Sequence, residues 1–179
     1  MKSIKSKAPS SYAVDYHPYD ANLPAAFSEV KRLIQQALPD VRVEHVGSSS
    51  IPGVGGRNAI DIVIPTAVSD QAAIKSHLAT LGFQDSPWQH FLPLLVGAVV
   101  FQGKEYTILL YVLPPDSDVY TGWITFRDYM RTHPEDAQAY DLMKQQTIAG
   151  GKVQRGQYQQ AKTPFLVSMM AKIQRSAKS

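Results

Sequence analysis

The stretch from residue 44 to residue 64 holds the side chains with the clearest chemical potential in this 179-residue chain. A turn within it begins with one glycine and three serines, Gly47, Ser48, Ser49 and Ser50. Backbone amides and hydroxyls in such a turn can converge on a phosphate. Asp61 follows on an expected strand, where its carboxylate could hold Mg²⁺ that neutralises the same phosphate. The pattern predicts a site for a nucleotide or another phosphorylated small molecule, with Mg²⁺ as the cofactor. Spacing alone fits a purely structural turn better, in which glycine supplies a positive φ.

Positive charge gathers toward the end of the chain. Residues 142–179 include seven basic residues and no acidic one, although the net charge of the whole chain is only +3. This imbalance favours an anionic partner such as a phosphate group, and a solvated helix surface that lacks acids explains it equally well. Nucleic acid is a less expected partner, because the tract shows no nucleic-acid-binding motif.

The elements that must position these residues follow from hydrophobic periodicity. Alternating valines predict a half-buried strand over 41–46, and β-branched residues predict a buried strand over 59–64. Two more strands, 92–101 and 106–113, are expected to pair as antiparallel neighbours. Helices are expected over 20–38, 69–81, 123–131, 134–149 and 157–175, with Ser69 as an N-cap and Pro164 as either a kink or the true start of the last helix. The order predicts an α+β fold, a mixed β-sheet flanked by helices with a helical C-terminal third.

Length and composition indicate one domain over residues 11–179, preceded by a flexible basic tail over residues 1–10. No apolar run approaches the roughly 20 residues of a membrane span, and no apolar stretch of a signal peptide follows the basic start. We therefore expect a cytoplasmic protein with no membrane partner. The absence of cysteine excludes disulfides, thiolate metal sites and a cysteine nucleophile. Composition leaves the oligomeric state open.

Several motifs, in chain order, resemble those of the GrpB family. They are Pro18-Tyr19-Asp20 before the first helix, the run EHVGSSSIPGV over 44–54, the run FRDYMRTHP over 126–134, Ala139-Tyr140 with Lys144, and the run AKTPF over 161–165. The family is similar to minimal nucleotidyltransferases, so the resemblance implies that fold and transfer of a nucleotidyl group to a small acceptor. In that superfamily a Gly-Ser pair is followed by two carboxylates two residues apart, and here Gly47, Ser48 and Asp61 match.

The second carboxylate of the superfamily pattern is replaced by Val63. Two carboxylates two apart on a strand share one face and hold two metal ions, so this motif by itself cannot form a two-metal site. Glu44 and Glu105 are the nearest substitutes. The strand over 107–113 supplies no third carboxylate, and Leu109 and Tyr111 stand where many GrpB sequences carry a His-x-His pair. A catalytically degenerate phosphate-ligand binder, or a scaffold module, is the alternative that Val63 favours.

The remaining candidates are histidine, basic and aromatic residues elsewhere in the chain. His45 is either a base or phosphate donor, or a strand histidine bonded to backbone. GrpB sequences usually have Lys-Pro before the strand that carries the aspartate, and Arg57 keeps that positive charge here. Lys162 matches a lysine near the end of the family's sequences, which implies a contact with phosphate. Arg127 and Arg131 lie four apart on one helical face, where they bind either an anion or a neighbouring carboxylate. Trp88 and Trp123 are expected in the core. The expected site thus comprises Asp61, His45 and Glu44 as catalytic residues, Asp61 as the metal ligand, and Gly47, Ser48, Ser49, Ser50, Arg57, Arg127 and Lys162 as phosphate or nucleotide ligands.

Overall fold

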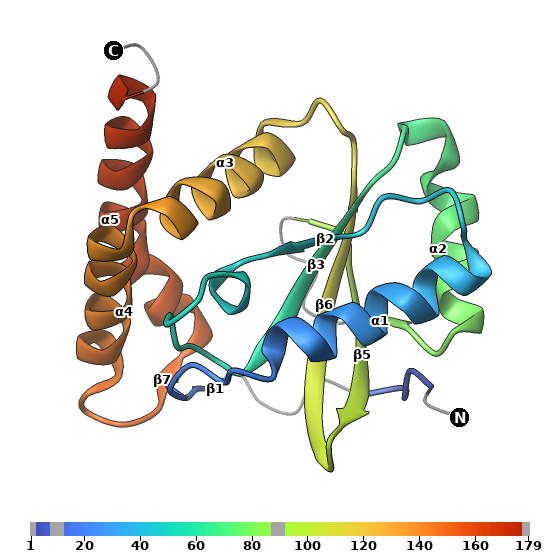
Figure 1. Cartoon of the computed structure of the whole chain (residues 1–179), viewed down its shortest axis with the longest axis horizontal. Coiled ribbons are helices and arrows are strands. Elements are labelled where there is room, and N and C mark those ends of the chain that lie inside the picture. The colour runs from blue at the N-terminus through green and yellow to red at the C-terminus, as the bar shows by residue number, and fades with distance from the viewer. Residues whose placement is uncertain (1–2, 8–12, 87–91, 177–179) are drawn as a thin grey trace.

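A five-stranded mixed sheet lies at the centre of the computed structural model, which describes residues 3–7, 13–86 and 92–176 (Figure 1). Its strand order is β2-β3-β6-β5-β4. The strands are β2 (Glu44–Val46), β3 (Ala59–Pro65), β4 (Gln84–Asp85), β5 (Leu94–Phe101) and β6 (Lys104–Leu113). The central pair, β3 and β6, is parallel, and the other pairs are antiparallel. A separate two-stranded ribbon joins β1 (Ala13–Val14) to β7 (Val153–Gln154).

Helices cover the two faces of the sheet unequally (Figure 1). On one face α1 (Leu23–Ala37) and α2 (Gln71–Thr80) close the main core, which contains Ile60, Ile62 and Ile64 of β3. Beside the other face stand α3 (Asp118–Thr132), α4 (Pro134–Ile148) and α5 (Arg155–Ser176). These three helices share a second core with Ile51 and Val54 of the loop after β2. The loop over residues 47–56, called the glycine loop below, is therefore packed between the sheet and the helical third.

Strand alternation decides which residues face the helical third. Successive side chains of a strand point to opposite faces, so Ile60 and Ile62 enter the main core while Asp61 and Val63 face the side of α3. Val63 is fully buried there with Val46 and Tyr120. The same alternation in β2 places His45 on the side of α1 rather than on the side of Asp61.

The expected α+β fold and its order of main elements are confirmed, with shifts at several boundaries. The helix expected over 123–131 begins at Asp118, because the Ser117 hydroxyl caps it by accepting a hydrogen bond from the amide of Tyr120. The last helix begins at Arg155 and continues through Pro164. Ser69 is not the N-cap of α2: that position is held by Asp70, after a short 3₁₀ turn.

The expected flexible tail is partly folded onto the sheet. Ile4 is buried in the main core, and Lys5 exchanges backbone hydrogen bonds with Ala98 of β5. Trp88, expected in the core, lies outside the described residues. Within the described part of the chain, no helix is both long enough and apolar enough to cross a membrane.

Arg127 joins α3 to β2 through a buried set of polar contacts. Its guanidinium donates to Glu44 Oε2 at 2.7 Å, to the carbonyl oxygen of His45 at 3.1 Å and to Asp128 at 2.7 Å. Only 9% of the side chain is exposed. A buried cation with a carboxylate partner and a backbone acceptor is costly to remove, because the partners are left desolvated. Of the two partners expected for Arg127, an anion or a neighbouring carboxylate, the structure thus supports the carboxylate.

We expect Arg127→Ala to lower the free energy of unfolding by about 3 kcal/mol, as for other half-removed buried ion pairs. Arg32→Ala is the control: its exposed pair with Glu29 spans 2.9 Å, and its loss should leave the free energy of unfolding nearly unchanged. Urea unfolding followed by circular dichroism measures both. An Arg127→Ala protein as stable as the control would contradict this role.

Candidate functional site

A cavity of about 490 Å³ lies between the Asp61 face of the sheet, the glycine loop, α3 and α5. Its lining residues are Val46, Gly47, Ser48, Arg57, Asp61, Tyr111, Asp118, Val119, Gly122, Trp123, Phe126, Arg155, Tyr158, Gln159, Lys162, Leu166 and Met170. The volume suits a small-molecule ligand. The cavity thus joins the residues from 46 to 61 with a helix that begins almost one hundred residues later.

Gly47 brings the start of the glycine loop against Asp61. It adopts φ +68° and ψ −175°, a combination that is essentially restricted to glycine. A Cβ at this position would lie 2.5 Å from Asp61 Oδ2. Glycine is therefore required twice, for the backbone conformation and for the approach of the Asp61 carboxylate.

The three serines of the loop have separate roles. Ser48 lines the cavity. Ser49 contacts Nε2 of His45 at 3.0 Å, and the Ser50 hydroxyl donates to the carbonyl oxygen of Gly47 at 2.7 Å. One serine of the three therefore faces the cavity, while the other two stabilise the turn.

Two charged residues of α4 hold the far end of the glycine loop at Gly55. Asp141 Oδ1 accepts the Gly55 amide at 2.7 Å, and Lys144 Nζ donates to the Gly55 carbonyl oxygen. The lysine is buried, with its ammonium over the ring of Tyr140. Burial lowers the pKa of Lys144 to about 7, against a smaller opposing effect from Asp141. Both polar backbone groups of Gly55 are thus satisfied by side chains of α4.

Positive charge converges on Asp61 inside the cavity. Arg57 Nη2 lies 3.8 Å from Asp61 Oδ1, and Lys162 and Arg155 of α5 also attract this carboxylate. Burial nevertheless raises the pKa of Asp61, and the cations only partly oppose that effect. Burial, with the repulsion from Arg57, lowers the pKa of Lys162 to about 8. Like charges brought together in a half-buried cavity form a ready site for an anion.

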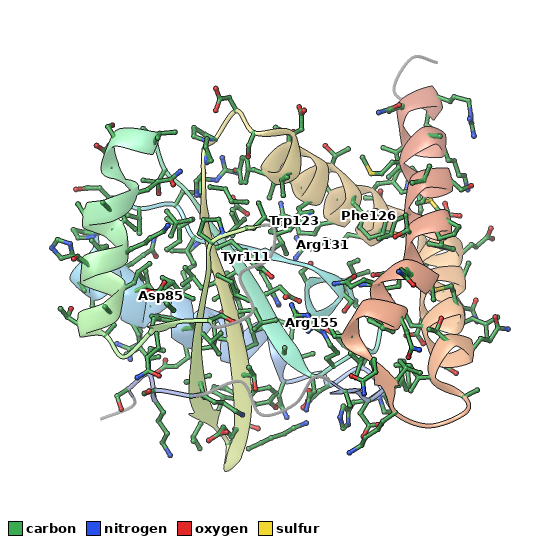
Figure 2. All side chains as sticks on the ribbon, turned by 180° about the vertical axis from the view of Figure 1, so that it is seen from behind. Asp85, Tyr111, Trp123, Phe126, Arg131 and Arg155 are labelled. Atoms are coloured by element: carbon green, nitrogen blue, oxygen red, sulfur yellow. The ribbon has the colours of Figure 1, made fainter. Side chains whose placement is uncertain are left out.

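An aromatic and apolar wall forms the rest of the cavity. Figure 2 shows Tyr111 of β6, Trp123 and Phe126 of α3, and Arg155 of α5 around this region. The rings of Tyr111 and Trp123 meet edge to face, with centroids 4.9 Å apart. Trp123 therefore lines the cavity as well as packing against the apolar cluster between β3 and α3.

The residues that α5 contributes change character along the helix. Arg155, Tyr158 and Lys162 come first, and Leu166 and Met170 follow. At a rise of about 1.5 Å per residue, Met170 lies roughly 12 Å beyond Lys162 along the axis. The cavity is therefore cationic toward the beginning of α5 and apolar toward its end.

The structure brings together part of the expected site. Gly47, Ser48, Arg57, Asp61 and Lys162 line the cavity, whereas the other expected site residues do not. These are Glu44, His45, Ser49, Ser50 and Arg127. Among them the serines and Arg127 serve the loop and the β2–α3 contact, as described above.

His45 lies on the opposite side of the sheet from Asp61. Its ring stacks on Phe27 of α1, with centroids 4.5 Å apart. Burial, reinforced by Arg131 and Arg127, lowers the pKa of His45 to about 3. This placement fits the alternative of a structural strand histidine and gives no support to a base at the cavity.

The two substitute carboxylates do not complete a metal site with Asp61. Glu44 pairs with Arg42 and Arg127. Glu105 is exposed, pairs with Lys7 at 2.7 Å, and lies four residues along β6 from Leu109, the register partner of Asp61. That offset corresponds to roughly 13 Å along a strand.

The donor set near Asp61 does not fit two metal ions. The partners of Asp61 on the neighbouring strands are Val46 and Leu109, and Val63 follows two residues later. Within the described residues, no three histidine or carboxylate side chains gather as a metal site would require. A single Mg²⁺ would find one protein carboxylate here, Asp61, and would depend on water or a ligand for its other oxygen donors.

Sequence reasoning overlooked Arg155, Tyr158 and the aromatic wall. A signal was present: the cavity residues of α5 recur at 155, 158, 162, 166 and 170, a spacing that keeps them on one helical face. The sequence predicts Trp123 only as a core residue, because nothing in its local pattern separates a core aromatic from one that also borders a cavity.

Comparison with known proteins identifies the family. The model of the GrpB protein family matches residues 13–172. The chain belongs to the GrpB family. A GrpB protein of Enterococcus faecalis has the same fold, with a TM-score of 0.72 at 17% identity, over 92% of this chain and 100% of that one.

Curated relatives carry the family designation UPF0157. One from Pseudomonas aeruginosa is 31% identical in an alignment of 134 positions that covers 71% of this chain and 54% of that protein. One from Deinococcus radiodurans is 25% identical over 87% of this chain and 78% of the relative. The matched region is thus only about half of the Pseudomonas protein. Among solved structures, the Cid1 poly(U) polymerase aligns with a TM-score of 0.47 at 14% identity, over 79% of this chain and 42% of that one.

Gly47→Ala should destabilise the protein more than Gly53→Ala. Both glycines have positive φ, +68° and +79°, but a Cβ at Gly53 would meet nothing within 4 Å. We expect Gly53→Ala to lower the free energy of unfolding by about 1–2 kcal/mol, because alanine is strained in this backbone conformation. Gly47→Ala should cost about 2 kcal/mol more, because its methyl group overlaps the Asp61 carboxylate. Equal losses in chemical denaturation would show that the contact with Asp61 is not restrictive.

Lys144 should make the protein more stable as the pH rises from about 7 toward 10. The unfolded chain keeps the Lys144 proton up to the ordinary pKa of 10.5, whereas the folded protein releases it near 7. Folding therefore releases a proton in this window, and stability rises by up to about 1.4 kcal/mol per pH unit. Lys144→Met should lose that part of the slope in urea unfolding measured between pH 7 and 9.5. Parallel profiles for the two proteins would contradict this role for Lys144.

Proposed function

We propose that this GrpB protein binds a phosphorylated small molecule with a planar ring, such as a nucleotide, in the cavity between the sheet, α3 and α5. The observation that carries the proposal is the division of one cavity into two chemical halves. Arg57, Arg155 and Lys162 supply charge for phosphate, and Ser48 adds a hydroxyl donor. The aromatic wall formed by Tyr111, Trp123 and Phe126 suits the ring.

The cationic half suits phosphate by its chemistry. Two guanidinium groups offer forked N–H donors that match phosphate oxygens, and a lysine adds a compact positive charge. Because all three cations are half-buried, solvent screens their attraction for a ligand less than on an open surface. Phosphate contacts in this half would fix the position of the ligand.

The aromatic half supports a ring rather than an extended aliphatic chain. Trp123 and Phe126 line one side of the cavity with aromatic rings. Any of the nucleobases can stack on an aromatic ring, because every base has a π face. Leu166 and Met170 extend this half with apolar surface. A ring-bearing phosphate ester would therefore use both halves at once.

Nucleotidyl transfer by two metal ions does not fit the residues described around Asp61. The in-line reaction would need a second carboxylate beside Asp61 to hold the second ion, and that place is occupied by Val63, which is fully buried. Ligand binding therefore forms the proposal, and any transfer to an acceptor would require a different source of charge stabilisation.

Removing a cavity cation should weaken the binding of all phosphate ligands, whereas removing part of the aromatic wall should weaken the binding only of those with a ring. We expect Lys162→Gln to bind both ATP and inorganic triphosphate about tenfold less tightly, because a charge-assisted contact is lost. Trp123→Leu should bind ATP about fivefold less tightly and leave triphosphate unchanged, because only stacking is removed. Isothermal titration calorimetry with each ligand, and with GTP, CTP and UTP in place of ATP, measures these affinities.

Lys172→Gln is the matched control for charge. Lys172 lies on α5, ten residues after Lys162, but pairs with Asp136 at 2.7 Å outside the cavity. Its replacement should leave both affinities within about twofold of the wild type, because removal of a distant exposed charge is largely screened. If no nucleoside triphosphate and no triphosphate binds the wild-type protein, the proposed function is wrong.

A further inference from the structure

The carboxylate of Asp61 stands within a set of cations, not within a set of other carboxylates. Arg57, Arg155 and Lys162 line the cavity with it, and Lys144 attracts it from behind the glycine loop. On the sheet its neighbours are apolar: Val46 on one side and Leu109 on the other. A divalent cation brought to Asp61 would approach these positive groups closely.

The charges of the cavity indicate what Asp61 does there. The half-buried charged residues of the lining are three cations and Asp61, which leaves a net charge of +2. Asp118 also borders the cavity, but it is exposed. A phosphate dianion would balance this excess without a metal ion.

From this arrangement we infer that Asp61 is the resident counter-ion of an anion site built by the protein, and that the phosphate of the ligand binds to Arg57, Arg155 and Lys162 without a divalent metal. The inference rests on the proposed function and adds to it that basic side chains, rather than a metal ion, neutralise the charge of the bound phosphate. In the absence of ligand, Asp61 offsets the mutual repulsion of the cations. When phosphate binds, the same carboxylate repels it, so Asp61 limits affinity while it keeps the site assembled.

The geometry around Gly47 supports this role. The absence of a side chain at Gly47 leaves room for Asp61 Oδ2 directly against the loop backbone, and Asp61 Oδ1 is directed to Arg57. One carboxylate oxygen is therefore set against the loop, and the other is within reach of a guanidinium group. Both observations show how the loop and Arg57 hold the carboxylate among the cations.

Asp61→Asn separates a counter-ion from a metal ligand, because the two roles predict opposite signs. The amide keeps the size of the carboxylate and removes its charge. With ATP and with inorganic pyrophosphate in the presence of EDTA, we expect the variant to bind at least about fivefold more tightly than the wild type, because a repulsive charge beside the bound phosphate is gone. Asp118→Asn is the control at the exposed rim, where solvent screening should limit the gain to less than about twofold.

The same titrations are then repeated with Mg²⁺ in place of EDTA. Two results together support the inference. The wild-type protein binds no more tightly in Mg²⁺ than in EDTA, and Asp61→Asn binds more tightly than the wild type. A wild-type protein that binds only in Mg²⁺, or an Asp61→Asn variant that loses binding while its melting temperature is kept, overturns the inference and leaves the proposed function intact. If neither protein binds ATP or pyrophosphate in either buffer, the proposed function fails, and the counter-ion role fails with it.

Discussion

The folded protein depends on satisfying the polar backbone of a loop that runs between a sheet and three helices. A buried amide or carbonyl group without a partner costs free energy comparable to a lost hydrogen bond. In the glycine loop those partners are charged side chains: Asp141 and Lys144 bind Gly55, and Arg131 donates to the carbonyl oxygen of Ser50 at 2.9 Å. The helical third is therefore tied to the sheet by the loop itself, and it becomes one wall of the cavity.

Basic side chains serve two purposes in this protein, and their partners distinguish them. Arg127, Arg131 and Lys144 come from α3 and α4 and are used to hold backbone carbonyl groups. Arg57 and Lys162 face the cavity and share a single carboxylate, Asp61. A cation committed to a carbonyl group is a structural element, whereas cations gathered around one carboxylate keep capacity for a further anion.

Val63 shows why a second carboxylate would not be accommodated at this position of β3. Its side chain is fully buried and packs with Val46, Leu113 and Tyr120 between the sheet and α3. An ionised carboxylate there would lose its hydration within an apolar cluster, at a cost that only a paired cation could offset. The absence of a second carboxylate is thus linked to the contact that positions α3, and with it Trp123 and Phe126.

The amino-acid sequence was enough to predict the order of the main elements, the fold class and the family, because hydrophobic periodicity and contiguous motifs are local properties that can be read along the chain. It also indicated Gly47, Ser48, Arg57, Asp61 and Lys162, all of which line the cavity. Only the tertiary structure separated His45 from Asp61, because a one-residue difference in strand position sends a side chain to the opposite face of the sheet. Only the tertiary structure committed Glu44 and Arg127 to each other, and brought Arg155 to Asp61 across almost one hundred residues. Such pairings depend on how strands and helices pack in three dimensions, which no local pattern in the chain encodes.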